Sequence, residues 1–314
     1  MGDIEMTIVI PMYNNEKHVK LTIDSLKNQT SQAWQCIVID DESSDNSLSV
    51  AHSCIRGDKR FKVLKRKDFS ETKGGNVCRN IGLNRTLSDF VMFVDADDYL
   101  HNDCVHSRIK TIQNYSDYDF YIFKTAFVND DGVITGYFYN PNSHIPDILL
   151  RFVEHKIPWH TMSPVWNVNY LKSVGGWNED YERLQDVELN IRVLLKKPSI
   201  YFASSDIDSF YRSNEMTHKK RLNARLGFCR LIKDYYNLLS YSTQLGQVSK
   251  DRIHDVFQGI LEEQLANYIL HRHNTHDIED ENWKHIYMET LKVLDVDERN
   301  EVARIFNRDT QITY

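Results

Sequence analysis

The chain has 314 residues, of which 41% are hydrophobic and 26% charged, so it can bury a sizeable core, and its length suggests about two domains. Its 38 Lys and Arg against 45 Asp and Glu give a formal net charge of -7 without any long basic run, which argues against nucleic acid as a partner. No window approaches the roughly 18 uninterrupted apolar residues of a membrane span, and residues 1–6 lack a secretory signal pattern. We therefore expect a cytoplasmic protein.

The first part of the chain alternates short apolar strands with helical segments. Strands are predicted at 7–10, 34–39, 61–64 and 90–94, and helices at 16–29, 42–53 and 76–87. Strands that are apolar on both faces and alternate with helices predict an α/β fold with a mostly parallel sheet flanked by helices. Ligands of such sheets bind beyond the carboxyl ends of the strands. We expect the polar clusters at residues 12–15, 40–42 and 95–98 to surround one crevice.

The remainder of the chain is less regular. Residues 118–123 predict a strand, and the turn sequence at 129–132 predicts a hairpin with 133–139. A helix is predicted at 184–195, and from about residue 220 only helical patterns remain, among them 250–270. We expect one domain over residues 1–215 and a helical C-terminal subdomain over 216–314.

The five cysteines predict neither disulfides nor a zinc site. Their number is odd, and none belongs to a Cys-x-x-Cys pair. We expect them to be reduced and mostly buried, as small hydrophobic side chains are.

Asp95 and Asp97 form the strongest local signal for chemistry. Two carboxylates one residue apart, on a turn that follows a buried strand, can approach one hard cation. The same Asp-x-Asp pattern also occurs as a solvated turn before a helix, so it is weak evidence by itself.

Further segments occur with this turn in a fixed order: TIVIPMYN (7–14), CIVIDDESSDNS (36–47), GGNVCRNIG (74–82), VMFVDADDY (91–99) and GGWNEDYERLQDVE (175–188). Together they resemble the inverting, nucleotide-sugar-dependent glycosyltransferases of the GT-A fold, glycosyltransferase family two, over roughly residues 5–215. The resemblance implies a metal-dependent, hexosyltransferase-like enzyme with a Rossmann-like sheet. It implies a nucleotide-sugar donor, expected to be a UDP-sugar, a saccharide or lipid-linked acceptor, and a role in surface polysaccharide biosynthesis.

The resemblance also assigns roles to residues of this chain. For the nucleotide it implies contacts from Pro11, Tyr13, Asn14, one of Asp40 and Asp41, Arg79, Asp95 and Ala96, with Asp41 preferred over Asp40 for the base. For Mn²⁺ or Mg²⁺ it implies Asp97 and Asp95, with His218 as a further contact to metal or phosphate. For catalysis it implies Asp186 as the base, and for the acceptor Gly176 and Trp177. Gln185 departs from the Glu that the family usually has before the base.

These residue types suit sugar transfer. Loss of a nucleoside diphosphate leaves negative charge on the β-phosphate, which a divalent cation and Arg79 would neutralise. A carboxylate on the opposite side of the sugar must accept the proton of the attacking hydroxyl, a contribution of about 10²–10⁴-fold, and Asp186 fits this role. Displacement in one step inverts the anomeric centre.

The same residues also fit other interpretations. In isolation, each of these residues could simply cap a helix or form a surface ion pair. A phospho-receiver domain is excluded, because a strand and a helix precede residue 36 and the only Lys-Pro pair is at 197–198. A nucleotidyltransferase and a catalytically inactive nucleotide-sugar-binding protein are the alternatives that stay open. The C-terminal helices could contact the inner face of the membrane, form a homodimer or cover the sheet edge.

Overall fold

The computed structural model describes residues 5–129, 131–138, 144–212, 218–241, 250–271 and 279–294. The chain divides into two compact units, Met1–Glu215 and Met216–Tyr314. In the second unit, the described residues form three helices and no strand: α8 (His218–Ser240), α9 (Lys250–His271) and α10 (Glu279–Val293).

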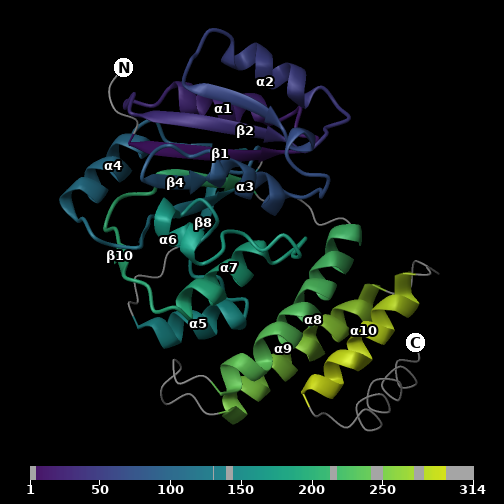
Figure 1. Ribbon diagram of the computed structural model, residues 1–314. Helices are drawn as coiled ribbons and strands as arrows, with labels where there is room; N and C mark the ends of the chain where they lie inside the picture. Colours follow the sequence, from purple (N-terminus) through teal and green to yellow (C-terminus); the bar gives the residue numbers. More distant parts are fainter. Residues whose placement is uncertain are drawn as a thin grey trace. The chain divides into compact units, whose positions relative to one another are not determined.

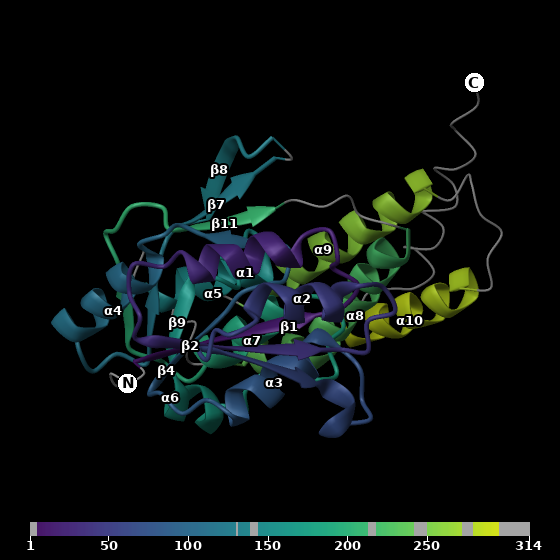
Figure 2. The same ribbon diagram turned by 90° about the horizontal axis from the view of Figure 1, so that it is seen from above.

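The first unit is built on a seven-stranded sheet (Figure 1) with the order β10-β6-β9-β4-β1-β2-β3. Its parallel half consists of β1 (Met6–Met12), β2 (Trp34–Asp40), β3 (Phe61–Lys65) and β4 (Phe90–Phe93). The connecting helices are α1 (Val19–Lys27), α2 (Ser47–Ile55) and, after the short 3-10 helix η1 (Arg66–Asp68), α3 (Gly75–Asn84). Figure 2 shows α1 and α2 on one face of this sheet and α3 on the other. The predicted mostly parallel sheet with helices on each side is confirmed.

The other half of this sheet is mixed. β9 (Pro164–Asn167) runs antiparallel to both β4 and β6 (Phe120–Ile122), and β10 (Ile200–Phe202) pairs in parallel with β6. The helices of this region are α4 (Cys104–Asn114), α5 (Ile145–Val153), α6 (Val168–Ser173) and α7 (Gln185–Leu194). Of these helices, α7 is the one that the sequence predicts.

A second sheet corrects the predicted hairpin. It has the order β5-β11-β7-β8 and contains β5 (Tyr99–Leu100), β11 (Ser209–Arg212), β7 (Thr125–Val128) and β8 (Ile134–Phe138). The partner of β8 is β7 rather than residues 118–123, because the chain leaves the first sheet after Ile122 and enters the second at Thr125. Figure 2 shows the β7–β8 hairpin beside β11.

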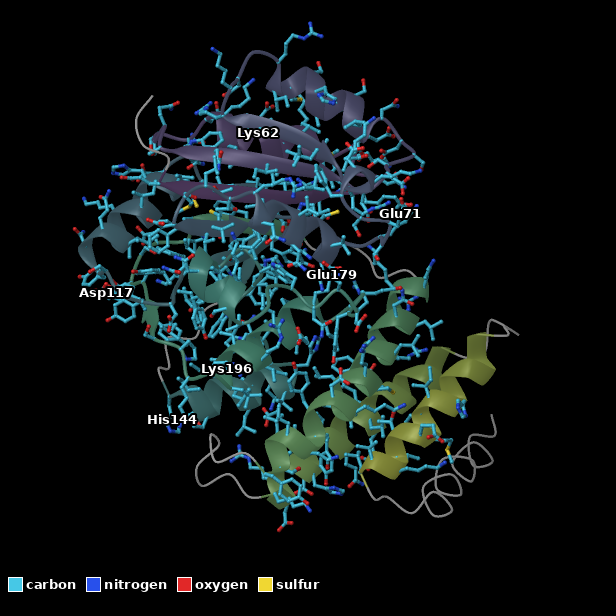
Figure 3. The ribbon with its side chains drawn as sticks, viewed as in Figure 1. Lys62, Glu71, Asp117, His144, Glu179 and Lys196 are labelled. Atoms are coloured by element: carbon cyan, nitrogen blue, oxygen red, sulfur yellow. The ribbon has the colours of Figure 1, made fainter. Side chains whose placement is uncertain are left out.

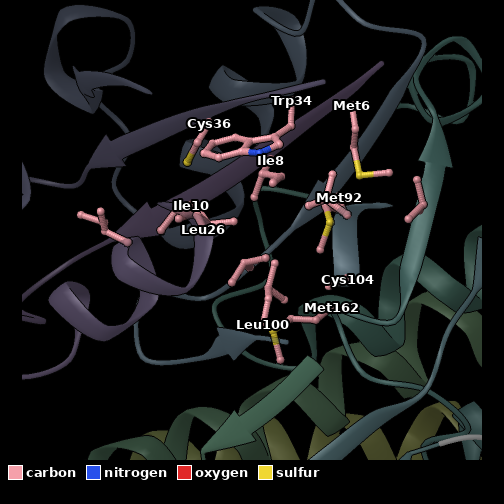
Figure 4. Packing of buried hydrophobic residues seen from close by; sticks show 14 of the residues in the cluster. Met6, Ile8, Ile10, Leu26, Trp34, Cys36, Met92, Leu100, Cys104 and Met162 are labelled. Carbon is pink, nitrogen blue, oxygen red and sulfur yellow. The ribbon is translucent and has the colours of Figure 1, made fainter. Parts of the chain in front are cut away.

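The main core fills the space between the first sheet, α1 and α4. Figure 4 shows part of it, including Ile8, Leu26, Trp34 and Met92. These side chains are at most 1% exposed, and burial of each large apolar side chain stabilises the fold by about 1.5–3 kcal/mol. On the opposite face of β1, Val9 is also fully buried, because α3 covers it. This double coverage explains why the strands are apolar on both faces.

The surface of the first unit carries charged and polar side chains of mixed kind. Figure 3 labels six of them, all exposed: Lys62, Glu71, Asp117, His144, Glu179 and Lys196. Within the described part of the chain, none of the helices has both the length and the apolar character that crossing a bilayer requires.

Candidate active site

A cavity of about 320 Å³ lies at the carboxyl ends of β1, β2 and β4. Because β1 lies between β2 and β4, the three polar strand ends meet there, as predicted. The start of α7 supplies a further wall. The lining residues are Pro11, Met12, Tyr13, Asn15, Asp41, Gly75, Cys78, Arg79, Asp95, Ala96, Asp97, Glu182, Arg183 and Gln185.

Arg79 connects two sides of this cavity. Its Nη2 donates to Asp95 Oδ1 at 2.7 Å, and its Nη1 donates to Gln185 Oε1 at 2.8 Å. Burial raises the pKa of Asp95, but Arg79 and His160 outweigh this and hold that pKa below its usual value. The result is a fixed guanidinium, paired with one carboxylate, at the cavity wall.

Two further carboxylates follow Asp95 in the acidic turn. Asp97 lines the cavity, whereas Asp98 is buried and accepts the backbone N–H of Arg212 at 2.9 Å. Burial and the neighbouring Asp95 and Asp97 raise the pKa of Asp98 well above its usual value. Asp98 therefore ties the acidic turn to β11.

The carboxylates of the acidic turn suit a divalent cation that is bound jointly by the protein and by the phosphates of a nucleotide. Among the described residues, no three His, Cys, Asp or Glu side chains form a preformed metal site. Mg²⁺ bound with a nucleotide typically has only one or two protein carboxylates, because phosphate oxygens and water complete its shell. Asp95 and Asp97, which both face the cavity, can supply those carboxylates.

The two acids after β2 have different surroundings. Asp41 lines the cavity, pairs with the buried Arg66 and accepts the backbone N–H of Gly74 at 2.9 Å. Asp40 does not line the cavity, and it accepts the backbone N–H of Ser43 at 3.3–3.4 Å. Of these two acids, Asp41 is therefore the one that faces the cavity, and it is also the one that the resemblance prefers for the nucleotide base.

Tyr13 and Asn14, although adjacent in the chain, also differ in their position relative to the cavity. Tyr13 lines the cavity and is 56% exposed, so its ring is available to a ligand. Asn14 does not line the cavity, and its side-chain oxygen accepts the backbone N–H of Ser44 at 2.8 Å. This position favours a structural role for Asn14, which holds the loop between β2 and α2.

Asp186 is the second residue of α7 and is half-buried, and unlike Gln185 before it, it does not line the cavity. Its Oδ1 accepts the backbone N–H of Val187 at 3.0 Å, an arrangement that a helix N-terminus favours for a carboxylate. The preceding residue, Gln185, bonds to Arg79, which in turn bonds to Asp95. One chain of hydrogen bonds therefore joins the acidic turn to the start of α7.

Gly176 and Trp177 lie behind Arg79. Trp177 is 3% exposed, and the Arg79 guanidinium lies over its ring, 4.6 Å from the centroid. Gly176 has a φ of 64°, and a Cβ there would lie 2.7 Å from the Asn80 side-chain oxygen. These positions favour support of Arg79 and α3 over contact with an acceptor.

His160 lies close to the site without lining the cavity, and no pattern in the sequence singles it out. Burial lowers the pKa of His160, while its electrostatic interactions with Asp95 and Asp186 raise it, and burial dominates. Its Nδ1 accepts the backbone N–H of Met162 at 3.4 Å. A single histidine in an irregular segment has no periodicity or partner spacing that would reveal this position. The side chain of His218, by contrast, lies outside the described residues.

The family profile described as "Glycosyl transferase family 2" matches residues 7–166. The chain belongs to this family. An uncharacterized glycosyltransferase of Haemophilus influenzae is 35% identical over 112 residues, which are 35% of this chain and 43% of that protein. The amylovoran biosynthesis glycosyltransferase AmsB of Erwinia amylovora is 33% identical over 137 residues, 42% of this chain and 44% of AmsB. The matches thus span less than half the length of these relatives.

Solved structures extend the likeness of fold to most of the chain. TarS 1-349 of S. aureus in complex with UDP-GlcNAc has a TM-score of 0.61 at 18% identity and covers 92% of this chain and 81% of TarS 1-349. A mannosyltransferase of Pyrobaculum calidifontis in complex with GDP-Man and Mn²⁺ has a TM-score of 0.56 at 12% identity, covering 93% of this chain and 86% of that one. The fold of this family-2 chain is therefore the GT-A fold.

Proposed function

We propose that this chain is an inverting glycosyltransferase that moves a sugar from a UDP-sugar to a hydroxyl of a saccharide or lipid-linked acceptor. The observation that carries the proposal is the hydrogen-bond chain Asp95–Arg79–Gln185, which brings the acidic turn and the residue before Asp186 to one cavity. Family membership and the UDP-GlcNAc complex of the similarly folded TarS support it.

The nucleotide would lie along the carboxyl ends of the strands. Tyr13 would stack on the base, and Asp41, held by Arg66, would accept its N–H. Arg79 would face the diphosphate. Asp97 and Asp95 would hold Mn²⁺ or Mg²⁺, which supplies positive charge to the β-phosphate as it leaves.

Asp186 would act as the general base. The acceptor oxygen bonds to the anomeric carbon while the bond from that carbon to the phosphate oxygen breaks. The electron pair of the broken bond stays on the diphosphate, and the acceptor proton passes to Asp186. Attack from the side opposite the leaving group inverts the anomeric configuration.

The setting that we propose is surface polysaccharide assembly at the cytoplasmic face of a membrane, with the helical second unit as a surface for peripheral membrane contact or for dimerisation. The name of AmsB, a polysaccharide biosynthesis glycosyltransferase, supports the first part.

Thermal unfolding with a panel of nucleotide sugars and Mn²⁺ tests the donor. A ligand at 100 times its dissociation constant stabilises the native state by about 2.7 kcal/mol, and we expect UDP-sugars to do so. If neither a UDP- nor a GDP-species shifts the melting temperature, the nucleotide assignment is wrong.

Two variants separate this function from the alternatives. The Asp186→Asn variant should lose sugar transfer but still bind UDP, because the substitution removes the general base and does not change the nucleotide cavity. Full transfer activity in this variant would exclude Asp186 as the general base.

Asp97→Ala should abolish turnover and weaken binding of the donor with Mn²⁺. A wild-type protein that binds UDP-sugars without any transfer would support the inactive binder, and formation of a nucleotide sugar from a sugar phosphate would support the nucleotidyltransferase.

A further inference from the structure

The second sheet presents aromatic rings on one face. Tyr211 of β11 pairs in register with Phe127 of β7, which pairs with Gly136 of β8, so these three residues point to the same side. Phe138 lies two residues beyond Gly136 and shares this side, because side chains alternate along a strand. The His160 ring lies against them, its centroid 4.4 Å from that of Tyr211 and 5.3 Å from that of Phe138.

We name this set of four residues, Phe127, Phe138, His160 and Tyr211, the aromatic platform. Phe127, Phe138 and Tyr211 are each half-buried, and Tyr211 also packs against the main core, whereas His160 is buried beneath them. Gly136 leaves room for the Phe127 ring, because a Cβ at Gly136 would lie 3.2 Å from it.

The aromatic platform lies beside both halves of the proposed catalytic apparatus. Arg212, which follows Tyr211, donates its backbone N–H to Asp98 of the acidic turn at 2.9 Å. His160 interacts electrostatically with both Asp95 and Asp186. The platform therefore lies next to the acidic turn, on the side from which His160 also senses Asp186.

The donor cavity and the aromatic platform do not share residues. None of the four platform residues is among those that line the 320 Å³ cavity at the strand ends. The platform offers aromatic faces, one hydroxyl and one imidazole, and it includes no carboxylate, Lys or Arg. Sites of this composition suit neutral ligands that have an apolar face and a few hydroxyl groups.

We propose that the aromatic platform binds a neutral pyranose ring of the acceptor saccharide, by contact of the C–H face of the sugar with the half-buried rings and of a sugar hydroxyl with the Tyr211 hydroxyl, while the buried His160 ring supports Tyr211 from below. This inference rests on the proposed function. It assigns the acceptor rather than the donor sugar, because in-line attack places the acceptor on the Asp186 side, away from the diphosphate. It also accounts for the partial exposure of Phe127 and Phe138 on the β7–β8 hairpin, where an extended acceptor could lie.

Saturation-transfer NMR with octyl β-glucoside, octyl β-galactoside and octyl β-N-acetylglucosaminide, each with UDP and the diamagnetic Mg²⁺ present, tests the platform. We expect at least one of these glycosides to receive saturation on its ring C–H protons from the wild-type protein. Phe138→Ala should weaken its binding by about five- to tenfold, the loss of one aromatic contact, and Phe138→Tyr should restore it. If no glycoside receives saturation from the wild-type protein, the platform proposal is wrong.

Tyr137→Ala is the matched control. Tyr137 precedes Phe138 on β8, is 59% exposed and points to the other side of the sheet, so its loss should leave glycoside binding within about twofold. Equal losses in Tyr137→Ala and Phe138→Ala would contradict the platform, as would a loss of UDP-GlcNAc binding in Phe138→Ala alone, which would assign the platform to the donor. Phe138→Leu keeps apolar bulk, so it distinguishes loss of the ring face from loss of folding.

UDP binding, measured by calorimetry on the same samples, separates the two proposals. Phe138→Ala should keep the dissociation constant of the wild-type protein for UDP. Absence of UDP binding in the wild-type protein would overturn the proposed function, whereas intact UDP binding without glycoside binding would overturn only the platform.

Discussion

At the scale of single residues, the site depends on how charges are paired. Arg66 is 1% exposed and bonds to Asp41, to Glu42 and to the Ser70 carbonyl oxygen. Burial lowers the pKa of Arg66, but Asp41 and Glu42 reverse this and raise it. The buried Arg66 cation therefore holds the Asp41 carboxylate, which we propose contacts the nucleotide base.

Arg66→Met should destabilise the protein by about 3–5 kcal/mol, because it leaves Asp41 without its buried partner. Chemical denaturation measures this change. The double variant Arg66→Met with Asp41→Asn should recover part of the loss, since no unpaired charge then remains. If the single variant costs less than about 1 kcal/mol, Asp41 does not depend on Arg66.

The neutral side chain of Gln185 is the second feature that sets the charge of the site. Its amide oxygen accepts a hydrogen bond from Arg79 but leaves the Arg79 charge in place, whereas a carboxylate would neutralise that charge. Gln185→Glu should weaken UDP binding by about fivefold, because a new negative charge faces the diphosphate site. Titration calorimetry measures the change. Gln185→Met, which adds no charge, is the control; equal affinities of the Glu and Met variants would show that charge at this position is unimportant.

At the scale of elements, the approach of α3 to β1 positions Arg79. Gly82 of α3 faces Val9 of β1, which is fully buried, and a Cβ on Gly82 would lie 2.3 Å from Val9 Cγ1. A larger residue at this position would push α3, and with it Arg79, away from the sheet.

Gly82→Ala should therefore destabilise the protein by about 1–3 kcal/mol through overpacking. Gly259→Ala in α9 is the matched control, because nothing lies within 4 Å of its added Cβ and alanine favours a helix by up to about 1 kcal/mol. Thermal or denaturant unfolding of both variants tests whether the two substitutions change the free energy of unfolding in opposite directions. A neutral Gly82→Ala would mean that α3 is loosely packed on β1.

At the scale of the whole molecule, the thiols are protected. The five cysteines are free, and all except the half-buried Cys54 are buried. Burial raises the pKa of Cys78 to about 12 and that of Cys229 to about 11, so thiolate is scarce at neutral pH. The expectation of mostly buried cysteines agrees with this arrangement.

In the native protein, we expect a thiol reagent such as dithionitrobenzoate to label at most Cys54 within minutes at pH 8. All five cysteines should react in denaturant. The absorbance of the thionitrobenzoate anion that is released gives the number of cysteines that have reacted. Rapid labelling of two or more cysteines in the native protein would show that a buried thiol is accessible.

The sequence by itself determined the parallel half of the fold and the strand-end site. In β1, β2 and β4, continuous apolar runs and the polar residues that follow them are local features, and the geometry of parallel strands brings such ends together. Asp41, Asp95 and Asp97 could therefore be expected at one crevice, whereas Arg79, on α3, was expected there only from the resemblance to the family.

Only the tertiary structure decided the rest, because it depends on contacts between residues far apart in the chain. The separation of β7 from residues 118–123, the burial of Trp177 under Arg79 and the turn of Asn14 toward Ser44 have no local signal. His160 comes close to the site through long-range packing, since its ring lies against Tyr211 of β11, about fifty residues later. Side-chain orientation in irregular segments follows such long-range packing, which no spacing of residues encodes.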